Sequence, residues 1–188
     1  MTLVVCGALP HTHHHARRGT SAISVASSSY LCNVKSTNTD TVRDLGYVGR
    51  IGGKTVHTYG DTLAAPGASF YMTSDSTAIG GTDPCQIFDA ALENGDHPAQ
   101  FVATEAKYGE TNTADAMGVT NIIDTHSDTG MVFFLKNHRP MGGQQYIAGA
   151  GIADVTMSGN VPSASRTSEF WWDAQAGEPW YGDVTAYG

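Results

Sequence analysis

Three aspartates lie in sequence segments where a carboxyl group could carry out acid–base chemistry. Asp44 and Asp61 lie near the two ends of residues 43–62, a segment with the pattern of two strands around a tight turn. A later segment, residues 181–187, has a similar pattern, and Asp183 lies near its start as Asp44 does in the first segment. Carboxylates at strand ends can face a common cleft, where they donate and accept protons. We therefore take Asp44, Asp61 and Asp183 as the candidate catalytic residues.

The elements that would position the first two aspartates form a predicted hairpin. Gly52 and Gly53 supply the positive φ angles that a tight hairpin turn requires. Residues 45–51 and 56–58 on either side carry β-branched and aromatic side chains, which suit a pleated surface. Asp44 and Asp61 should then lie at the open end of the hairpin.

The same order of strand, turn and strand recurs along the chain. Residues 118–124 and 131–135 are strand-like and flank the turn residues 127–130, and a third copy begins at residues 181–187. Further strand-like runs complete each unit, at residues 69–73, 100–103, 145–156 and 168–172. Each unit therefore holds about four strands, which is the content of a propeller blade.

We predict an all-β fold from these patterns. Long helical periodicity is missing, and the best helix candidate, residues 86–93, is brief and bounded by Pro84 and Gly95. The recurrence of the hairpin favours a β-propeller. A β-sandwich, which also has many short strands separated by turns, is the alternative.

Composition predicts one folded, turn-rich unit after a tail. The chain has 188 residues, of which 40% are apolar and 22 are glycine. Residues 1–29 are rich in His and Arg and then in Ser and Ala, so we interpret them as a disordered or misassigned tail, and expect the folded domain over residues 30–188. No carboxylate or further ligand set accompanies the tail histidines, so we predict no metal site and no cofactor.

Charge and hydropathy exclude some classes of binding partner. The net charge is -8, the pI is about 5.3 and no long basic run occurs, which argues against nucleic acid. No apolar run approaches the roughly 20 residues that span a bilayer, and residues 1–10 lack a basic n-region, so we predict no membrane partner and no clear signal peptide. Cys6, Cys32 and Cys85 are too few for a disulfide framework and leave room for one bridge, with Cys32 to Cys85 as a candidate.

Short motifs that occur in one order along the chain carry a family resemblance. They are Asp44-Leu45-Gly46, Gly52-Gly53-Lys54, Tyr59-Gly60-Asp61-Thr62, Gly118-Val119-Thr120-Asn121, Asn137-His138-Arg139-Pro140, Gly149-Ala150-Gly151-Ile152-Ala153, Phe170-Trp171-Trp172-Asp173 and Glu178-Pro179-Trp180-Tyr181-Gly182-Asp183-Val184. Together, from about Val34 to Gly188, they resemble the DUF4185 family, particularly its fungal members.

The resemblance implies a fold and an activity. The fold would be a five-bladed β-propeller of the arabinanase and invertase type, truncated here to about two blades and the start of a third. Some bacterial members of the family are assigned as endo-D-arabinanases, so the resemblance also implies a link to glycoside hydrolases, a carbohydrate partner and an extracellular location.

Under this resemblance the three aspartates would hydrolyse a glycosidic bond. One carboxyl group protonates the leaving oxygen and another acts as base or nucleophile. Asp44 is the leading base or nucleophile, Asp183 would supply or tune the second group with Glu178 as the competing acid, and Asp61 matches a further acid of the family pattern. The alternative reading is structural, because an Asp beside glycine commonly stabilises a turn through its own side chain.

The predicted substrate-binding residues are Asn121, His138, Arg139, Trp172, Trp180 and Tyr181. The polar members can hydrogen-bond sugar hydroxyl groups, and aromatic faces can stack on sugar rings. A surface turn before Pro140 is the structural alternative for His138 and Arg139. Adjacent residues of a strand face opposite sides, so one of Trp171 and Trp172 should belong to the core.

The sequence thus predicts a carbohydrate-active propeller that hydrolyses a furanose-containing or related polysaccharide through paired carboxylates. Two alternatives stay open: a noncatalytic carbohydrate-binding or adhesion propeller, and an inactive gene fragment. The sugar, the linkage and the stereochemical outcome do not follow from the sequence.

Overall fold

The computed structural model describes residues 27–64, 67 and 72–182. The chain divides into two compact units, Met1–Leu31 and Cys32–Gly188. Residues 27–31, the described part of the first unit, contain no helix or strand, and most of the predicted tail lies outside the described residues. The second unit is all-β, as predicted, and the described residues include no α-helix and one 3₁₀ turn, η1 (Ala106–Tyr108).

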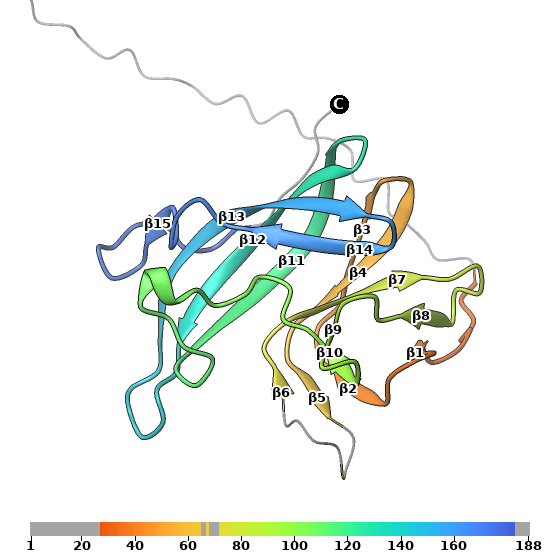
Figure 1. Ribbon diagram of the computed structural model, residues 1–188, viewed down its shortest axis with the longest axis horizontal. Helices are drawn as coiled ribbons and strands as arrows, with labels where there is room; N and C mark the ends of the chain where they lie inside the picture. Colours follow the sequence, from red (N-terminus) through yellow and green to blue (C-terminus); the bar gives the residue numbers. More distant parts are fainter. Residues whose placement is uncertain (1–26, 65–66, 68–71, 183–188) are drawn as a thin grey trace, which may run out of the picture. The chain divides into compact units, whose positions relative to one another are not determined.

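The first sheet is built on the predicted hairpin. Gly52 and Gly53, at φ 57° and 72°, form the two-residue turn, and Ile51 pairs with Lys54 across it. The sheet has the order β1-β8-β7-β4-β3 (Figure 1). Its strands are β1 (Lys35–Ser36), β3 (Tyr47–Ile51), β4 (Lys54–Tyr59), β7 (Ser76–Gly80) and β8 (Gln86–Phe88). All neighbours are antiparallel except β1 and β8, so β3, β4, β7 and β8 form an antiparallel meander.

The second sheet contains the second predicted hairpin. Its order is β11-β12-β13-β14, with β15 pairing to β13. The strands are β11 (Asp115–His126), β12 (Thr129–His138), β13 (Tyr146–Ser158), β14 (Val161–Ser165) and β15 (Trp172–Asp173). Ser127 at φ 52° and Asp128 make the turn between β11 and β12. The pairing register shifts between Val119 and Ile122, which marks a bulge at Thr120 and Asn121.

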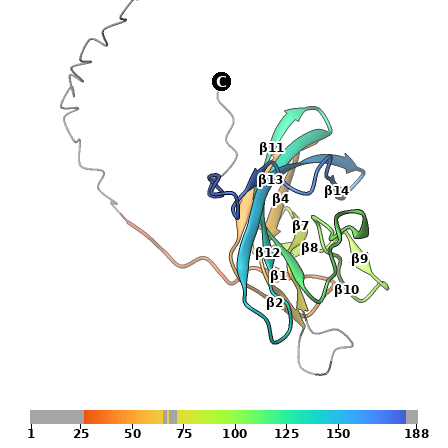
Figure 2. The ribbon, with the colours of Figure 1, turned by 90° about the vertical axis from the view of Figure 1, so that its left-hand side faces the viewer.

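The two large sheets pack against each other. β3 and β4 contact β11, and β4 lies close to β11 in both views (Figures 1 and 2). Ile51 and Val56 from the first sheet share one buried cluster with Val132 and Phe134 from the second. The bulge in β11 is bound across this interface, because the Thr58 hydroxyl donates to the Thr120 carbonyl at 2.7 Å.

The close approach of the β3 and β11 backbones at this interface requires a glycine. A Cβ built on Gly49 of β3 would lie 2.0 Å from the carbonyl oxygen of Ile122 in β11. No larger residue fits without moving one of the two strands.

Two small sheets lie beside the large ones. One joins β2 (Thr41–Arg43), β5 (Thr62–Ala64) and β6 (Met72–Thr73), and the other pairs β9 (Leu92–Glu93) with β10 (His97–Pro98). These short strands carry part of the wall of the cavity described below.

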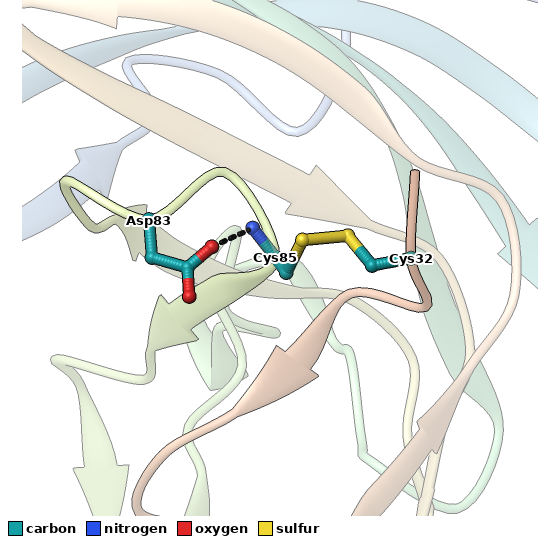
Figure 3. The surroundings of a disulfide bond; sticks show 3 residues. All are labelled: Cys32, Asp83 and Cys85. Atoms are coloured by element: carbon teal, nitrogen blue, oxygen red, sulfur yellow. Dashed lines mark hydrogen bonds between the residues drawn. A yellow bond between two sulfur atoms is a disulfide. The ribbon is translucent and has the colours of Figure 1, made fainter. Parts of the chain in front are cut away.

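A disulfide attaches the start of the second unit to β8. Cys32 is bonded to Cys85, the pairing considered from the sequence, and the Cys85 N–H donates to Asp83 Oδ1 at 2.9 Å (Figure 3). The N–H of Lys35 donates to the Cys85 carbonyl at 3.0 Å, which begins the pairing of β1 with β8.

Some expectations from the sequence need correction. Residues 100–103 are not a strand, and Phe101 and Val102 instead pack into the buried core from a loop. The brief helix candidate 86–93 contains β8 and β9, in agreement with the predicted all-β fold. Of the predicted strand 69–73 only Met72–Thr73 is described, and most of the third hairpin copy lies outside the described residues. Among the described strands no sheet closes on itself.

Candidate functional site

The inner face of the β11–β12 hairpin changes from apolar to charged near one end. Alternate residues of a strand share a face, so Val132 and Phe134 of β12 are followed on the same face by Lys136 and His138. Asp115 is the cross-strand partner of His138. The sheet therefore carries its buried apolar core and a group of ionisable side chains on one continuous surface.

A buried ion cluster forms at this end of the hairpin. Arg166 binds both carboxylate oxygens of Glu110, at 3.0 and 2.5 Å, and Lys136 Nζ lies 3.0 Å from Glu110 Oε1. Lys136 also donates to Glu169. The Arg166 guanidinium lies over the Tyr108 ring, 5.0 Å from its centroid. The cluster is thus a bidentate pair extended by a second cation.

The contacts within the ion cluster favour the charged forms of Glu110 and Lys136. Burial acts to raise the pKa of Glu110, but hydrogen bonds from Arg166, the Glu105 N–H and Lys136 bring that pKa below its ordinary value. Burial acts to lower the pKa of Lys136, and hydrogen bonds to Glu169 and Glu110 raise it above its ordinary value. Glu110 and Lys136 therefore each stabilise the ionised form of the other.

A cavity of about 330 Å³ opens beside this end of the hairpin. Its wall comes from β6, the β9–β10 hairpin and the start of β11, and the side chains that line it are mainly polar. The lining residues are Met72, Thr73, Ser74, Glu93, His97, Gln100, Asn112, Thr113, Ala114, Asp115, Ala116 and Arg139. Amide, carboxylate, imidazole and guanidinium groups thus meet in one hollow.

Asp115 links the cavity to the ion cluster. Its Oδ1 lies 2.9 Å from His138 Nδ1 and 4.0 Å from Lys136 Nζ, and its Oδ2 accepts the Thr111 N–H at 2.9 Å. The carboxyl group is 5% exposed, so these contacts fix its direction. His138 in turn lies against the Tyr146 ring, with 5.1 Å between ring centroids.

Three of the predicted residues meet at the edge of the cavity. Arg139 lines the cavity, and its guanidinium lies 3.6 Å from Asp61 Oδ1. Asp44 neighbours Asp61 through the backbone, because its N–H donates to the Asp61 carbonyl at 3.0 Å. Asp44 is exposed and does not line the cavity. The structure thus brings Asp61 and Arg139 together, with Asp44 next to them.

The other predicted residues lie elsewhere. Asn121 lies in the β11 bulge, where its Oδ1 is buried and has no hydrogen-bond partner among the described residues. Trp172 packs against Phe133, whereas Trp171 is 52% exposed, which confirms that one of the two belongs to the core. Trp180 and Tyr181 are partly and largely exposed. Asp183 lies outside the described residues.

Sequence reasoning missed Asp115 and Glu93 as lining residues. The predicted strand began at residue 118, but β11 begins at Asp115. The signal was present, because Asp115 has the same parity as Met117 and Val119 and therefore faces the core side with them. Glu93 was assigned to a short helix candidate, and no periodic pattern marks it.

Searches against protein-family models, curated proteins and solved structures found no match to this chain, so the resemblance to the DUF4185 family stays a prediction. Within the described part of the chain, no group of three or more His, Cys, Asp or Glu residues has the arrangement to hold a metal ion. No helix of the described residues is long and apolar enough to cross a bilayer.

Proposed function

We propose that this protein binds carbohydrate in the cavity beside β11. The observation that carries the proposal is the mixture of hydrogen-bonding groups in one hollow, with Asn112, Gln100, Asp115 and Arg139 in its wall. Sugars present closely spaced hydroxyl groups that both donate and accept. Planar amide, carboxylate and guanidinium groups match such pairs of hydroxyls.

Charge supports a neutral ligand. The chain has a net charge of -8, which disfavours an anionic partner at long range. Within the cavity, the guanidinium of Arg139 is balanced by the Asp61 carboxylate. A neutral oligosaccharide is therefore the ligand class that the site fits best.

Hydrolysis of a glycosidic bond is the second candidate function. Glu93 and Asp115 both line the cavity, and Asp61 lies at its edge through Arg139. Two carboxyl groups across the bond are what glycoside hydrolysis requires. On this hypothesis the predicted pair of Asp44 and Asp183 gives way to carboxylates that line or border the cavity.

The fold and the disulfide support two further proposals, a partial propeller and an extracellular location. Both large sheets contain a four-strand antiparallel meander, the strand content of a propeller blade, and they support a partial propeller as a proposal. Face-to-face packing of two meanders also occurs in β-sandwiches. The Cys32–Cys85 bridge is typical of proteins in oxidising compartments and supports an extracellular location.

Binding is tested by titrating a panel of neutral and furanose-containing oligosaccharides by calorimetry. Arg139→Ala removes a donor pair from the cavity and should weaken binding about ten- to a hundredfold, as expected for hydrogen bonds to a charged group. Arg50→Ala, at an exposed arginine of β3 that does not line the cavity, is the matched control and should bind like the wild type. Equal affinity of both variants would place the ligand elsewhere and contradict the proposal.

Hydrolysis is tested on the same panel by the release of reducing ends. Glu93→Gln and Asp61→Asn keep the size of the side chain and remove its acid, so a hydrolase should lose most of its turnover in at least one of them while still binding sugar. If the wild type binds sugar but releases no reducing ends, the hydrolase hypothesis is wrong and the protein is a noncatalytic carbohydrate-binding protein.

A further inference from the structure

Exposed aromatic side chains gather in the last described segment of the chain. Residues 170–182 contain the exposed Trp171, Trp180 and Tyr181, which we call the aromatic platform, and the half-buried Trp172, which packs against Phe133. Trp171 is 52% exposed, Trp180 39% and Tyr181 77%. Aromatic residues make up only 9% of the chain, so their concentration in this segment needs a reason other than composition. Exposed apolar clusters of this kind mark interaction sites.

The first half of the platform is fixed to the second sheet. β15 pairs with β13 through Gly149 and Ala150, and the Trp171 N–H donates to the Ala150 carbonyl at 2.8 Å. Trp172 lies against Phe133, with 6.3 Å between ring centroids. Figure 1 shows β15 beside β13 at the end of that sheet. The backbone of Trp171 is therefore bonded to β13.

The second half of the aromatic platform also lies close to Phe133. Asp173 Oδ1 accepts the N–H groups of Gln175 and Ala176, and the Asp173 N–H donates to Glu178 Oε2, so the intervening turn is closed by its own acids. A Cβ built on Gly182 would lie 3.3 Å from the Phe133 ring. Phe133 thus contacts Trp172 directly and also lies close to Gly182, the residue that follows Tyr181.

Charge limits the kind of partner. The only side chains within residues 170–182 that carry a charge at neutral pH are Asp173 and Glu178, both acidic. A segment without lysine or arginine disfavours nucleic acid and anionic lipid, which draw on basic side chains. Carboxylate oxygens beside aromatic faces suit neutral sugars, whose hydroxyl groups donate to the acids while their C–H faces contact the rings.

Ring orientation limits the partner further. Within the platform, the Trp180 and Tyr181 rings are inclined by 79° to each other. A flat crystalline polysaccharide would need rings in one plane. Rings turned against each other can instead follow a single chain that twists between successive sugar units.

We infer that the aromatic platform is a second polysaccharide-binding surface, which holds a single neutral chain through several sugar units. The inference rests on carbohydrate as the ligand class of the proposed function. None of the platform residues lines the cavity, so the two surfaces can be tested separately. A second surface would raise the affinity for long chains by making their attachment multivalent.

The test is native gel electrophoresis in gels that contain a soluble neutral polysaccharide, compared with calorimetry on the disaccharide of the same sugar. Trp171→Ala and Tyr181→Ala should each weaken retention by the polysaccharide about three- to tenfold, the range of an aromatic contact, and should leave disaccharide binding unchanged. Phe88→Ala, at an aromatic residue of β8 that is 47% exposed, is the matched control and should be retained like the wild type. Circular dichroism and thermal melting verify that each variant is folded.

The outcomes separate the two proposals. Unchanged retention of folded Trp171→Ala and Tyr181→Ala overturns the platform, whereas disaccharide binding that depends on Arg139 would still support the cavity. Weaker retention of the platform variants with no effect of Arg139→Ala supports the platform and overturns the cavity. Light scattering without sugar measures the oligomeric state of both proteins. A dimeric wild type with a monomeric Trp171→Ala variant would show that the platform binds a second copy, and would overturn the inference.

Discussion

Asp75 carries a buried carboxyl group whose ionisation should control the stability of the fold. Its side chain is fully buried, its Oδ2 accepts the Val102 N–H at 2.8 Å, and its Oδ1 has no hydrogen-bond partner among the described residues. Burial raises the pKa of Asp75 to about 8, although the N–H groups of Val102 and Phe101, the Gln100 side chain and Arg166 act to lower it. The folded protein therefore holds a proton that the unfolded chain has lost at neutral pH.

The sign and size of the effect follow from this difference. The unfolded carboxyl titrates near 3.8 and the folded one near 8, so the contribution of Asp75 to stability is fully present below pH 3.8 and falls as the pH rises toward 8. Each pH unit in this window costs about 1.4 kcal/mol. From pH 5 to pH 8 the loss is about 4 kcal/mol, a large share of the 5–15 kcal/mol that stabilises a typical domain.

The assay is urea denaturation of the wild type and of Asp75→Asn at pH 5 and pH 8. Asparagine has nearly the same shape and does not ionise, so the loss of about 4 kcal/mol between the two pH values should disappear in the variant. Other titrating groups affect both proteins equally, and the comparison of the two pH values removes any constant cost of the substitution. An equal loss in both proteins would show that Asp75 does not hold its proton in the folded state.

Two further substitutions test the packing and the covalent frame. Gly49→Ala places a Cβ against the backbone oxygen of Ile122 and should lower the free energy of unfolding by about 3 kcal/mol or more, whereas Gly118→Ala, where a Cβ meets only ordinary contacts, should be neutral or slightly stabilising. Replacing both Cys32 and Cys85 by serine should cost about 4 kcal/mol, from a loop whose ends are 53 residues apart. Urea denaturation measures both, and a Gly49→Ala protein as stable as Gly118→Ala would contradict the close approach of the sheets.

The hairpins could be predicted because their signals are local. Gly52 and Gly53 specify a tight turn by themselves, and the strands beside them have the expected side chains. The bulge at Thr120 and Asn121 is instead bound across the interface between the two sheets, through the Thr58 hydroxyl. No local pattern of residues records such a contact.

The candidate site depends on contacts that no local pattern contains. Glu110 and Arg166 are separated by 56 positions, and neither lies in a periodic segment that would aim one at the other. Arg139 could be named from its motif, but its contact with Asp61 depends on how the end of β12 meets the loop after β4. Motifs therefore identified several participants, while the cavity that joins them came only from the tertiary structure.

The buried ion cluster is better explained by the carboxylate that it orients than by a gain in the free energy of folding. A buried ion pair is often no more stabilising than well-packed apolar residues of similar volume, because both charges lose water. Here, however, Lys136 bonds Glu110 and lies within 4.0 Å of Asp115, which lines the cavity. An apolar residue in place of Lys136 would keep the core filled but leave the Asp115 carboxylate with less to orient it. We therefore interpret the cluster as the support that aims a carboxylate at the cavity.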